Sequence, residues 1–266
     1  MFDSIAGDYD ALNHILSLDV DKIWRKKALK QIVDAPAPAR VLDLACGTGD
    51  FSIAIAKALS RSHKRVGTPI EAHVKAPAKV PVEAQVTSTG FVTGDSGRSD
   101  LMTKGHVTGV DLSEGMLAVM REKVAKAGLT EMISIEEGDG ENLRFPDNTF
   151  DRVTIAFGIR NFEDRPKGLR EMLRVLKPGG RLVILELSRP ENKIICWFYD
   201  LYFLHILPKV GGKVSGDKAA YAYLPASVAA FPGKKAFMAT MREAGFRAVT
   251  HKAFTLGICR MYTGEK

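Results

Sequence analysis

Acidic residues surround a glycine-rich turn in the segment VLDLACGTGD, and this pattern predicts a site for a cationic ligand. Asp43 lies in the apolar run before the turn, and Asp50 follows its last glycine. Gly47 and Gly49 allow a tight turn and a close approach of the backbone to a ligand. The dinucleotide pattern GxGxxG fails, because Ser52 stands at the third glycine position. A pyrophosphate would be repelled here, whereas S-adenosylmethionine, which carries an ammonium and a sulfonium, would be attracted.

Two later carboxylates extend this pattern. Asp111 ends the run HVTGV, where it can accept hydrogen bonds from both hydroxyls of an adenosine ribose. Asp139 follows a third apolar run, where it can accept from the adenine amino group, and Gly140 leaves room for the ring. Each acid alone is more often a helix cap or a solvated loop residue. Their order at the ends of consecutive runs favours a nucleoside site.

The elements that must position these residues alternate along the chain. An acidic loop at the end of each strand requires parallel strands, and alternation of strands with helices predicts them. Strands are expected at 40–44, 106–110, 133–137, 150–156, 181–187, 246–254 and 258–263, and helices at 51–59, 114–127 and 167–176. A turn at Gly257 joins the last two strands, so the last strand should be antiparallel. The prediction is a doubly wound, seven-stranded, mostly parallel α/β sheet.

Three segments stand outside this alternation within a single predicted domain, 1–266. Residues 1–35 form an amphipathic helical cap that acts as a lid. Residues 61–105 read as a low-complexity insertion, with seven Lys/Arg against four acids and no helical period. Residues 190–232 form an aromatic cap, whose run IICWFYDLYFLHILP is too short to span a bilayer. Its aromatic residues either pack a cap helix or serve a prenyl tail or a membrane surface, and both interpretations remain open.

Composition excludes several classes of protein. The 266 residues are 45% hydrophobic and 26% charged, which is typical of a globular protein. Three cysteines without a CxxC pair predict a reducing cytoplasm, with neither a disulfide framework nor a zinc site. No signal peptide or membrane span is expected. The net charge of +7 favours anionic surfaces but is too weak to indicate nucleic-acid binding.

The motifs DLACGTGD, GVDLSEGML, GDGENLRFPDNTFD and RLVILEL resemble those of class I S-adenosylmethionine-dependent methyltransferases, whose fold is Rossmann-like. Three longer segments are similar to the UbiE/COQ5 family of quinone C-methyltransferases, and the resemblance omits only about 61–105. They are FDSIAGDYDALNHILSLDVDKIWRKKAL (2–29), AFGIRNFEDRPKGLREMLRVLKPGG (156–180) and LELSRPEN…FYDLYFLHILPKVGG (185–212). The resemblance implies methylation of demethylmenaquinol to menaquinol. The alternative acceptor is 2-methoxy-6-polyprenyl-1,4-benzoquinol of ubiquinone biosynthesis.

The resemblance also implies cofactor contacts. It adds Thr48, in the glycine loop, to the predicted cofactor contacts. It also supports the predicted contacts of Asp111 and of the pair Asp139-Gly140. Ala156 departs from the family, whose members often carry a serine there that touches the cofactor. The predicted cofactor-binding set is Asp43, Gly47, Thr48, Gly49, Asp111, Asp139 and Gly140, with no metal.

The implied reaction needs a phenolate-stabilising group and a proton acceptor rather than a metal. Arg160 follows the fourth strand, where a fixed cation can stabilise a developing phenolate, and Asn161 can orient the hydroxyl. The competing interpretation of Arg160 is an ion pair with Glu163 or Asp164. Tyr9, in the amino-terminal segment, can close over the substrate and relay the proton, although simple packing is its alternative. The predicted catalytic set is Arg160, Asn161 and Tyr9.

Other functions fit this sequence less well. A hydride-transferring oxidoreductase conflicts with the broken GxGxxG pattern, and an RNA- or protein-directed methyltransferase lacks aromatic-rich basic stripes. A non-catalytic scaffold of a quinone-biosynthesis complex conflicts with the intact loop and acids. The expected partners are a polyprenylated naphthoquinol and the cytoplasmic face of the membrane, with no nucleic acid, and a homodimer is compatible with the sequence.

Overall fold

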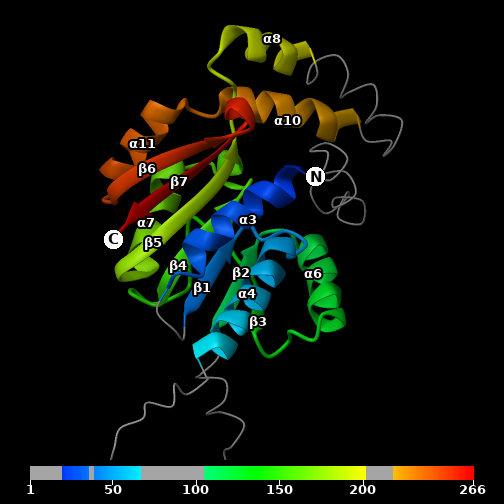
Figure 1. The fold of residues 1–266 in the computed structure, drawn as a ribbon, viewed down its shortest axis with the longest axis vertical. Helices are drawn as coiled ribbons and strands as arrows, with labels where there is room; N and C mark the ends of the chain where they lie inside the picture. Colours follow the sequence, from blue (N-terminus) through cyan, green and yellow to red (C-terminus); the bar gives the residue numbers. More distant parts are fainter. Residues whose placement is uncertain (1–19, 36–38, 67–104, 202–217) are drawn as a thin grey trace, which may run out of the picture.

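A seven-stranded sheet forms the centre of the molecule, and helices cover both of its faces (Figure 1). The structure is a computed structural model that describes residues 20–35, 39–66, 105–201 and 218–266. The strand order is β3-β2-β1-β4-β5-β7-β6. The order reverses between β1 and β4, and ligands bind outside the carboxyl ends of the strands at such a point.

The strands confirm the predicted topology. The bounds are β1 (Arg40–Leu44), β2 (His106–Asp111), β3 (Ile133–Glu137), β4 (Phe150–Ala156), β5 (Leu176–Leu187), β6 (Arg247–Phe254) and β7 (Cys259–Glu265). The first five pair in parallel, and β7 lies between β5 and β6, antiparallel to both. The antiparallel last strand is therefore confirmed.

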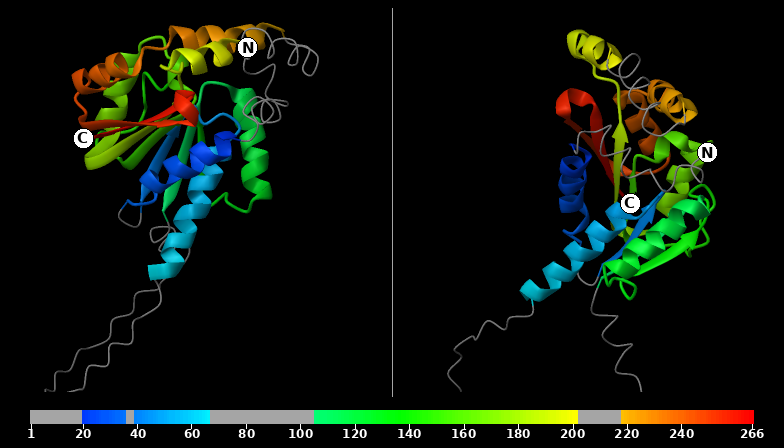
Figure 2. Two further views of the ribbon diagram at one scale, coloured as in Figure 1. Left: turned by 45° about the horizontal axis from the view of Figure 1, so that its top comes forward. Right: turned by 90° about the vertical axis from the view of Figure 1, so that its right-hand side faces the viewer.

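Two hydrophobic clusters attach the helices to the sheet. The helices are α3 (Val20–Ile32), α4 (Asp50–Val66), α6 (Glu114–Lys126), α7 (Arg165–Val175), α8 (Lys193–Leu201), α10 (Lys218–Ala230) and α11 (Lys234–Glu243), with 3₁₀ turns η1 (Ile159–Asn161) and η3 (Thr255–Gly257). One cluster joins α3, α4 and α6 to one face of the sheet, and the other joins α7 and α11 to the opposite face. Figure 2 shows these two layers from the side.

Two boundaries differ from the prediction by more than two residues. β5 begins at Leu176 rather than 181, because Leu176 already pairs with Phe150 before an irregularity in the register. Gly179, at φ 74°, bends the chain within this irregular part. α4 continues to Val66, so the first residues assigned to the insertion belong to a helix. The rest of the predicted insertion, 67–104, lies outside the described residues.

The carboxyl ends of the parallel strands lie at one end of the sheet. Helices α8 and α10 lie beyond that end (Figures 1 and 2). α10 contacts η1, which follows β4. Among the described residues, no helix is long and apolar enough to cross a membrane. Most of the predicted amino-terminal cap falls outside the described residues, and α3 is the part of it that the structure shows.

Candidate active site

The glycine loop after β1 adopts a conformation that its glycines permit. Gly47 and Gly49 have φ values of 56° and 82°, and Ala45 also has a positive φ of 49°. A Cβ atom on Gly49 would lie 2.4 Å from Cγ of Met120 in α6. Glycine is therefore required at this position both for the turn and for the close approach of α6.

Asp111 connects this loop to the end of β2. Its Oδ2 accepts a hydrogen bond from the backbone N–H of Gly47 at 2.8 Å, and its Oδ1 accepts from that of Ser113 at 2.9 Å. A carboxylate oxygen can accept more than one hydrogen bond, so this arrangement remains compatible with a ribose contact. The structure thus brings together Gly47 and Asp111, as the prediction requires, while the ribose contact itself stays a prediction.

Asp43 lies beneath the loop. Its side chain is buried, and its Oδ2 accepts a hydrogen bond from the Ser52 hydroxyl, at 2.5 Å, at the start of α4. Burial raises the pKa of the Asp43 carboxyl to about 7, and the negative charge of Asp111 adds to this, while the Ser52 hydrogen bond and Arg25 oppose it. This geometry makes Asp43 an anchor between the loop and α4, and its negative charge is only partial near neutral pH.

Two cations flank the end of the glycine loop. The Lys123 ammonium, from α6, pairs with Asp50 and donates a hydrogen bond to the Thr48 hydroxyl at 3.3 Å. Nη1 of Arg25, from α3, lies 3.9 Å from Oδ2 of Asp50. Thr48 is buried. Three helices therefore meet at this loop, and each contributes a charged side chain.

The predicted adenine end lies after β3. Oδ1 of Asp139 accepts a hydrogen bond from the backbone N–H of Glu141 at 2.8 Å. A Cβ atom on Gly140 would lie 2.5 Å from Phe162, so the structure explains this glycine by the ring of Phe162. The prediction that Gly140 leaves room for adenine remains untested. Leu112 is 68% exposed beside this region, as an open binding surface requires.

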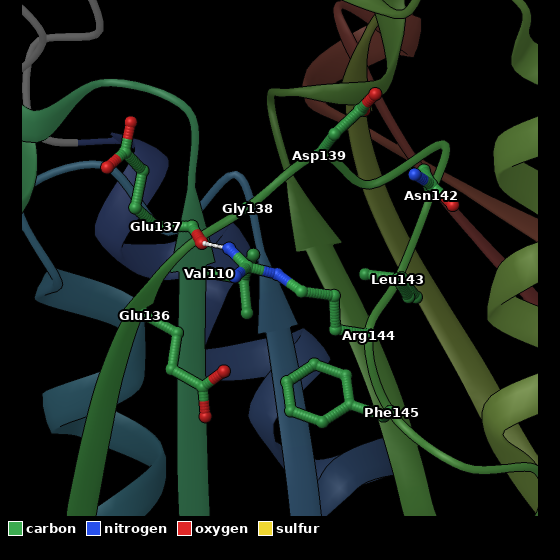
Figure 3. A pocket seen from close by; sticks show the side chains of 9 residues that line it. All are labelled: Val110, Glu136, Glu137, Gly138, Asp139, Asn142, Leu143, Arg144 and Phe145. Carbon is green, nitrogen blue, oxygen red and sulfur yellow. Dashed lines mark hydrogen bonds between the residues drawn. The ribbon is translucent and has the colours of Figure 1, made fainter.

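A shallow depression adjoins Asp139 (Figure 3). Its empty volume is about 220 Å³, including open solvent, which is less than a nucleoside-sized ligand usually needs. Nη2 of Arg144 donates a hydrogen bond across it to the Glu137 carbonyl at 2.7 Å (Figure 3). The lining residues are Val110, Glu136, Glu137, Gly138, Asp139, Asn142, Leu143, Arg144 and Phe145. The depression marks one side of the predicted adenine end and is not a complete site.

The turn after β4 packs directly against the glycine loop. A Cβ atom on Gly158 would lie 2.4 Å from Cβ of Ala45. Phe157, which precedes it, has a positive φ of 63°, a strained conformation for a bulky residue. Strain of this kind accumulates at functional sites. The family-specific segment AFGIRN is therefore in contact with the predicted cofactor loop.

Arg160 is held by a partner that was not predicted. Its Nη1 lies 2.8 Å from Oε1 of Glu186, at the end of β5, and its backbone N–H donates to Oε2 at 3.1 Å. Glu186 is fully buried and Arg160 is 9% exposed. Nε of Arg160 donates to the Ser227 hydroxyl in α10 at 3.3 Å. The expected alternative pairing with Glu163 or Asp164 is wrong, because the side chain turns into the protein.

Asn161 faces α10. Its Oδ1 accepts a hydrogen bond from the Tyr223 hydroxyl at 2.9 Å. Sequence reasoning missed both Tyr223 and Glu186. The lone acid in the apolar run RLVILEL did signal that Glu186 needs a buried cation, whereas nothing local distinguishes Tyr223. Tyr9 lies outside the described residues, so its predicted role stays a prediction.

The exposed face of α8 is apolar. Ile194, Trp197, Phe198 and Leu201 are 71%, 61%, 60% and 38% exposed, and their spacing places them on one side of the helix. Tyr199 is buried on the other side. For Trp197 and Phe198, the interpretation as core residues of a cap helix is therefore wrong.

The sequence and the structure were compared with known proteins. The model of the ubiE/COQ5 methyltransferase family matches residues 1–266. A relative named ubiquinone/menaquinone biosynthesis C-methyltransferase UbiE, from Geobacter sulfurreducens, is 43% identical over the whole chain and 87% of its own length. Demethylmenaquinone methyltransferases from Bacteroides fragilis and Deinococcus radiodurans are 39% and 41% identical, over the whole chain and 91% of each relative.

Solved structures agree on the fold. A SAM-dependent methyltransferase from Aquifex aeolicus has a TM-score of 0.53 at 20% identity, covering 90% of this chain and 88% of that one. A putative S-adenosyl-L-methionine-dependent methyltransferase from Methanococcus maripaludis has a TM-score of 0.59 at 16% identity, covering 100% and 94%. At these identities the likeness shows the Rossmann-like methyltransferase fold alone.

Proposed function

Because the chain belongs to the ubiE/COQ5 methyltransferase family, we propose that it transfers a methyl group from S-adenosylmethionine to the ring carbon of demethylmenaquinol, giving menaquinol. It is an S-adenosylmethionine-dependent C-methyltransferase of menaquinone biosynthesis. The contact between the glycine loop and the AFGIRN turn supports the proposal, because methyl transfer needs the donor and the acceptor to bind side by side.

The proposed reaction needs the reduced acceptor, because the oxidised quinone ring is electron-poor. The ring carbon ortho to a phenolic hydroxyl attacks the methyl carbon of the donor. The bond between the methyl carbon and the sulfonium sulfur breaks. The donor becomes S-adenosylhomocysteine, and the ring carbon loses its proton to restore aromaticity. The protein contributes alignment of the two reactants and stabilisation of the phenolate.

The described residues divide this work. Asp111 and the glycine loop hold the donor, and Asp43 fixes the start of α4 beneath them. The buried pair of Arg160 with Glu186 fixes η1, and Asn161 then presents its amide toward the substrate hydroxyl. Arg160 stabilises the phenolate electrostatically, with part of its positive charge offset by Glu186.

Methylation of defined acceptors tests this function. The purified protein is incubated with S-adenosylmethionine labelled in its methyl group and with one acceptor at a time. The acceptors are demethylmenaquinol, its oxidised quinone and 2-methoxy-6-polyprenyl-1,4-benzoquinol. The label should enter the ring of the naphthoquinol, and the oxidised quinone should remain unlabelled. Labelling of the benzoquinol alone would overturn the substrate assignment. Absence of label in either ring would overturn the assignment of quinol methylation.

The acceptor's prenyl tail suggests a peripheral position at the cytoplasmic face of the membrane. The exposed apolar face of α8 lies at the same end of the molecule as the predicted site (Figure 1). Trp and Phe are suited to the interface of a bilayer, and Lys193 at the start of α8 suits anionic lipids. A homodimer stays a prediction, which light scattering of the purified protein tests.

A further inference from the structure

We propose that Arg25 of α3 binds the α-carboxylate of S-adenosylmethionine. The inference rests on the proposed function and adds a donor contact that the motifs around the glycine loop do not supply. The donor carries three charged groups, an ammonium, a sulfonium and a carboxylate. The acids at the loop suit the first two, whereas the carboxylate needs a cation.

Packing fixes the position of Arg25 at the glycine loop. The preceding residue, Trp24, is buried, and its indole N–H donates to the Thr255 hydroxyl at 2.9 Å. The guanidinium of Arg25 lies over the ring of Phe157, with Cζ 5.7 Å from the ring centroid. Phe157 directly follows β4, and Asp50 directly follows the glycine loop. Arg25 therefore lies where the carboxyl ends of β1 and β4 meet α3.

The guanidinium has hydrogen-bonding capacity that its neighbours do not use. The Nε atom of Arg25 is buried and has no hydrogen-bond partner among the described residues. Its contacts with Asp21 and Asp50 are 3.5 and 3.9 Å, longer than hydrogen bonds. A buried donor without a partner is costly, and a bidentate carboxylate matches the planar guanidinium.

Lys123 is the other cation at this loop, and it is less suited to the role. Its ammonium already contacts both the Asp50 carboxylate and the Thr48 hydroxyl. Two of its three N–H donors are therefore already engaged, whereas Nε of Arg25 has no hydrogen-bond partner among the described residues. Arg25 can bind a ligand carboxylate and still keep its longer contacts with Asp21 and Asp50.

Decarboxylated S-adenosylmethionine provides a selective test, because it keeps both positive charges and lacks only the carboxylate. Arg25→Ala should weaken binding of S-adenosylmethionine by about 10- to 100-fold in calorimetry, as expected for a charge-assisted pair. Its affinity for the decarboxylated compound should stay within about twofold of the wild type. Arg25→Lys, which keeps the charge but not the fork, should give an intermediate loss for S-adenosylmethionine.

Lys26→Ala is the matched control, because it removes the same charge from an exposed position next to Arg25 on the same helix. It should leave both affinities unchanged. Equal losses for both compounds in Arg25→Ala, or no loss for either, would overturn the carboxylate contact. If the wild type itself binds neither compound, the proposed function fails, which is a separate result from failure of the Arg25 contact.

Discussion

Arg160 and Glu186 form a buried ion pair that links η1 to the end of β5. Removing one partner of such a pair leaves an uncompensated buried charge, which costs about 3–5 kcal/mol. We expect Arg160→Ala and Glu186→Gln both to lower the free energy of unfolding, and only Arg160→Ala to abolish turnover at a temperature where both variants are folded. Urea denaturation and the labelled-methyl assay measure the two effects.

Glu186→Gln is informative because its one amide oxygen keeps an acceptor for one of the two backbone N–H groups, of Arg160 and Leu187, that bind the two carboxylate oxygens. It also leaves the cation of Arg160 in place. Equal losses of turnover in the two variants would mean that Arg160 acts only by holding η1. Full turnover in Arg160→Ala would remove it from the mechanism.

Asp43 should make stability depend on pH. Its pKa is about 7 in the folded protein, against 3.8 in the unfolded chain. Between these values the native state holds a proton that the unfolded chain releases, so the free energy of unfolding falls as pH rises from about 4 to about 7, then levels off. Asp43→Asn keeps an acceptor for Ser52 and cannot titrate. It should reduce this slope by roughly 1 kcal/mol per pH unit in denaturation experiments between pH 5 and about pH 7.

The quantity to compare is the difference in the free energy of unfolding between Asp43→Asn and the wild type at each pH. The two proteins should be closest in stability at pH 5, where the wild-type carboxyl is protonated, and the variant should become relatively more stable toward pH 7. Parallel pH profiles would show that Asp43 does not titrate in this range.

Secondary-structure elements were the most predictable level of the molecule. β1, β3 and β4 have the predicted bounds, because short apolar runs end at turn-forming residues. The start of β5 was wrong by several residues, because pairing with Phe150 overrides the local Pro-Gly-Gly signal. The glycine loop and Asp111 were predictable from motif spacing. The partners Glu186 and Tyr223 were not assigned, because they come from distant elements and only the fold brings them to η1.

α8 is the element on which the proposed membrane contact depends. Trp197→Ser with Phe198→Ser removes two exposed aromatic side chains, so it should weaken sedimentation with vesicles of anionic phospholipid by at least about tenfold. Turnover of a short-tailed, water-soluble naphthoquinol should be unchanged.

Leu256→Ser supplies the control for α8, since Leu256 is 72% exposed in η3, outside that helix. It should bind vesicles as the wild type does. Unaltered vesicle binding of the double variant would exclude α8 as the membrane contact.

At the scale of the whole molecule, the end of α4 and the start of β2 lie away from the predicted site (Figure 1). α4 ends and β2 begins at the edge of the sheet opposite the glycine loop (Figure 1). Replacing residues 67–104 with a short Gly-Ser linker should therefore leave donor affinity and turnover within about twofold of the wild type, as calorimetry and the methyl-transfer assay measure. A folded but inactive product would show that the segment contributes to function.

The ring of Phe162 lies against two glycines, Gly140 at the predicted adenine end and Gly168 in α7, and it directly follows Asn161. We expect a shift of the ring on donor binding to move the neighbouring Asn161, the residue predicted to orient the acceptor hydroxyl. Such a shared side chain predicts thermodynamic linkage between the two substrates. Steady-state kinetics should accordingly show that a saturating donor changes the apparent affinity for quinol, and Phe162→Leu should make the two affinities more independent.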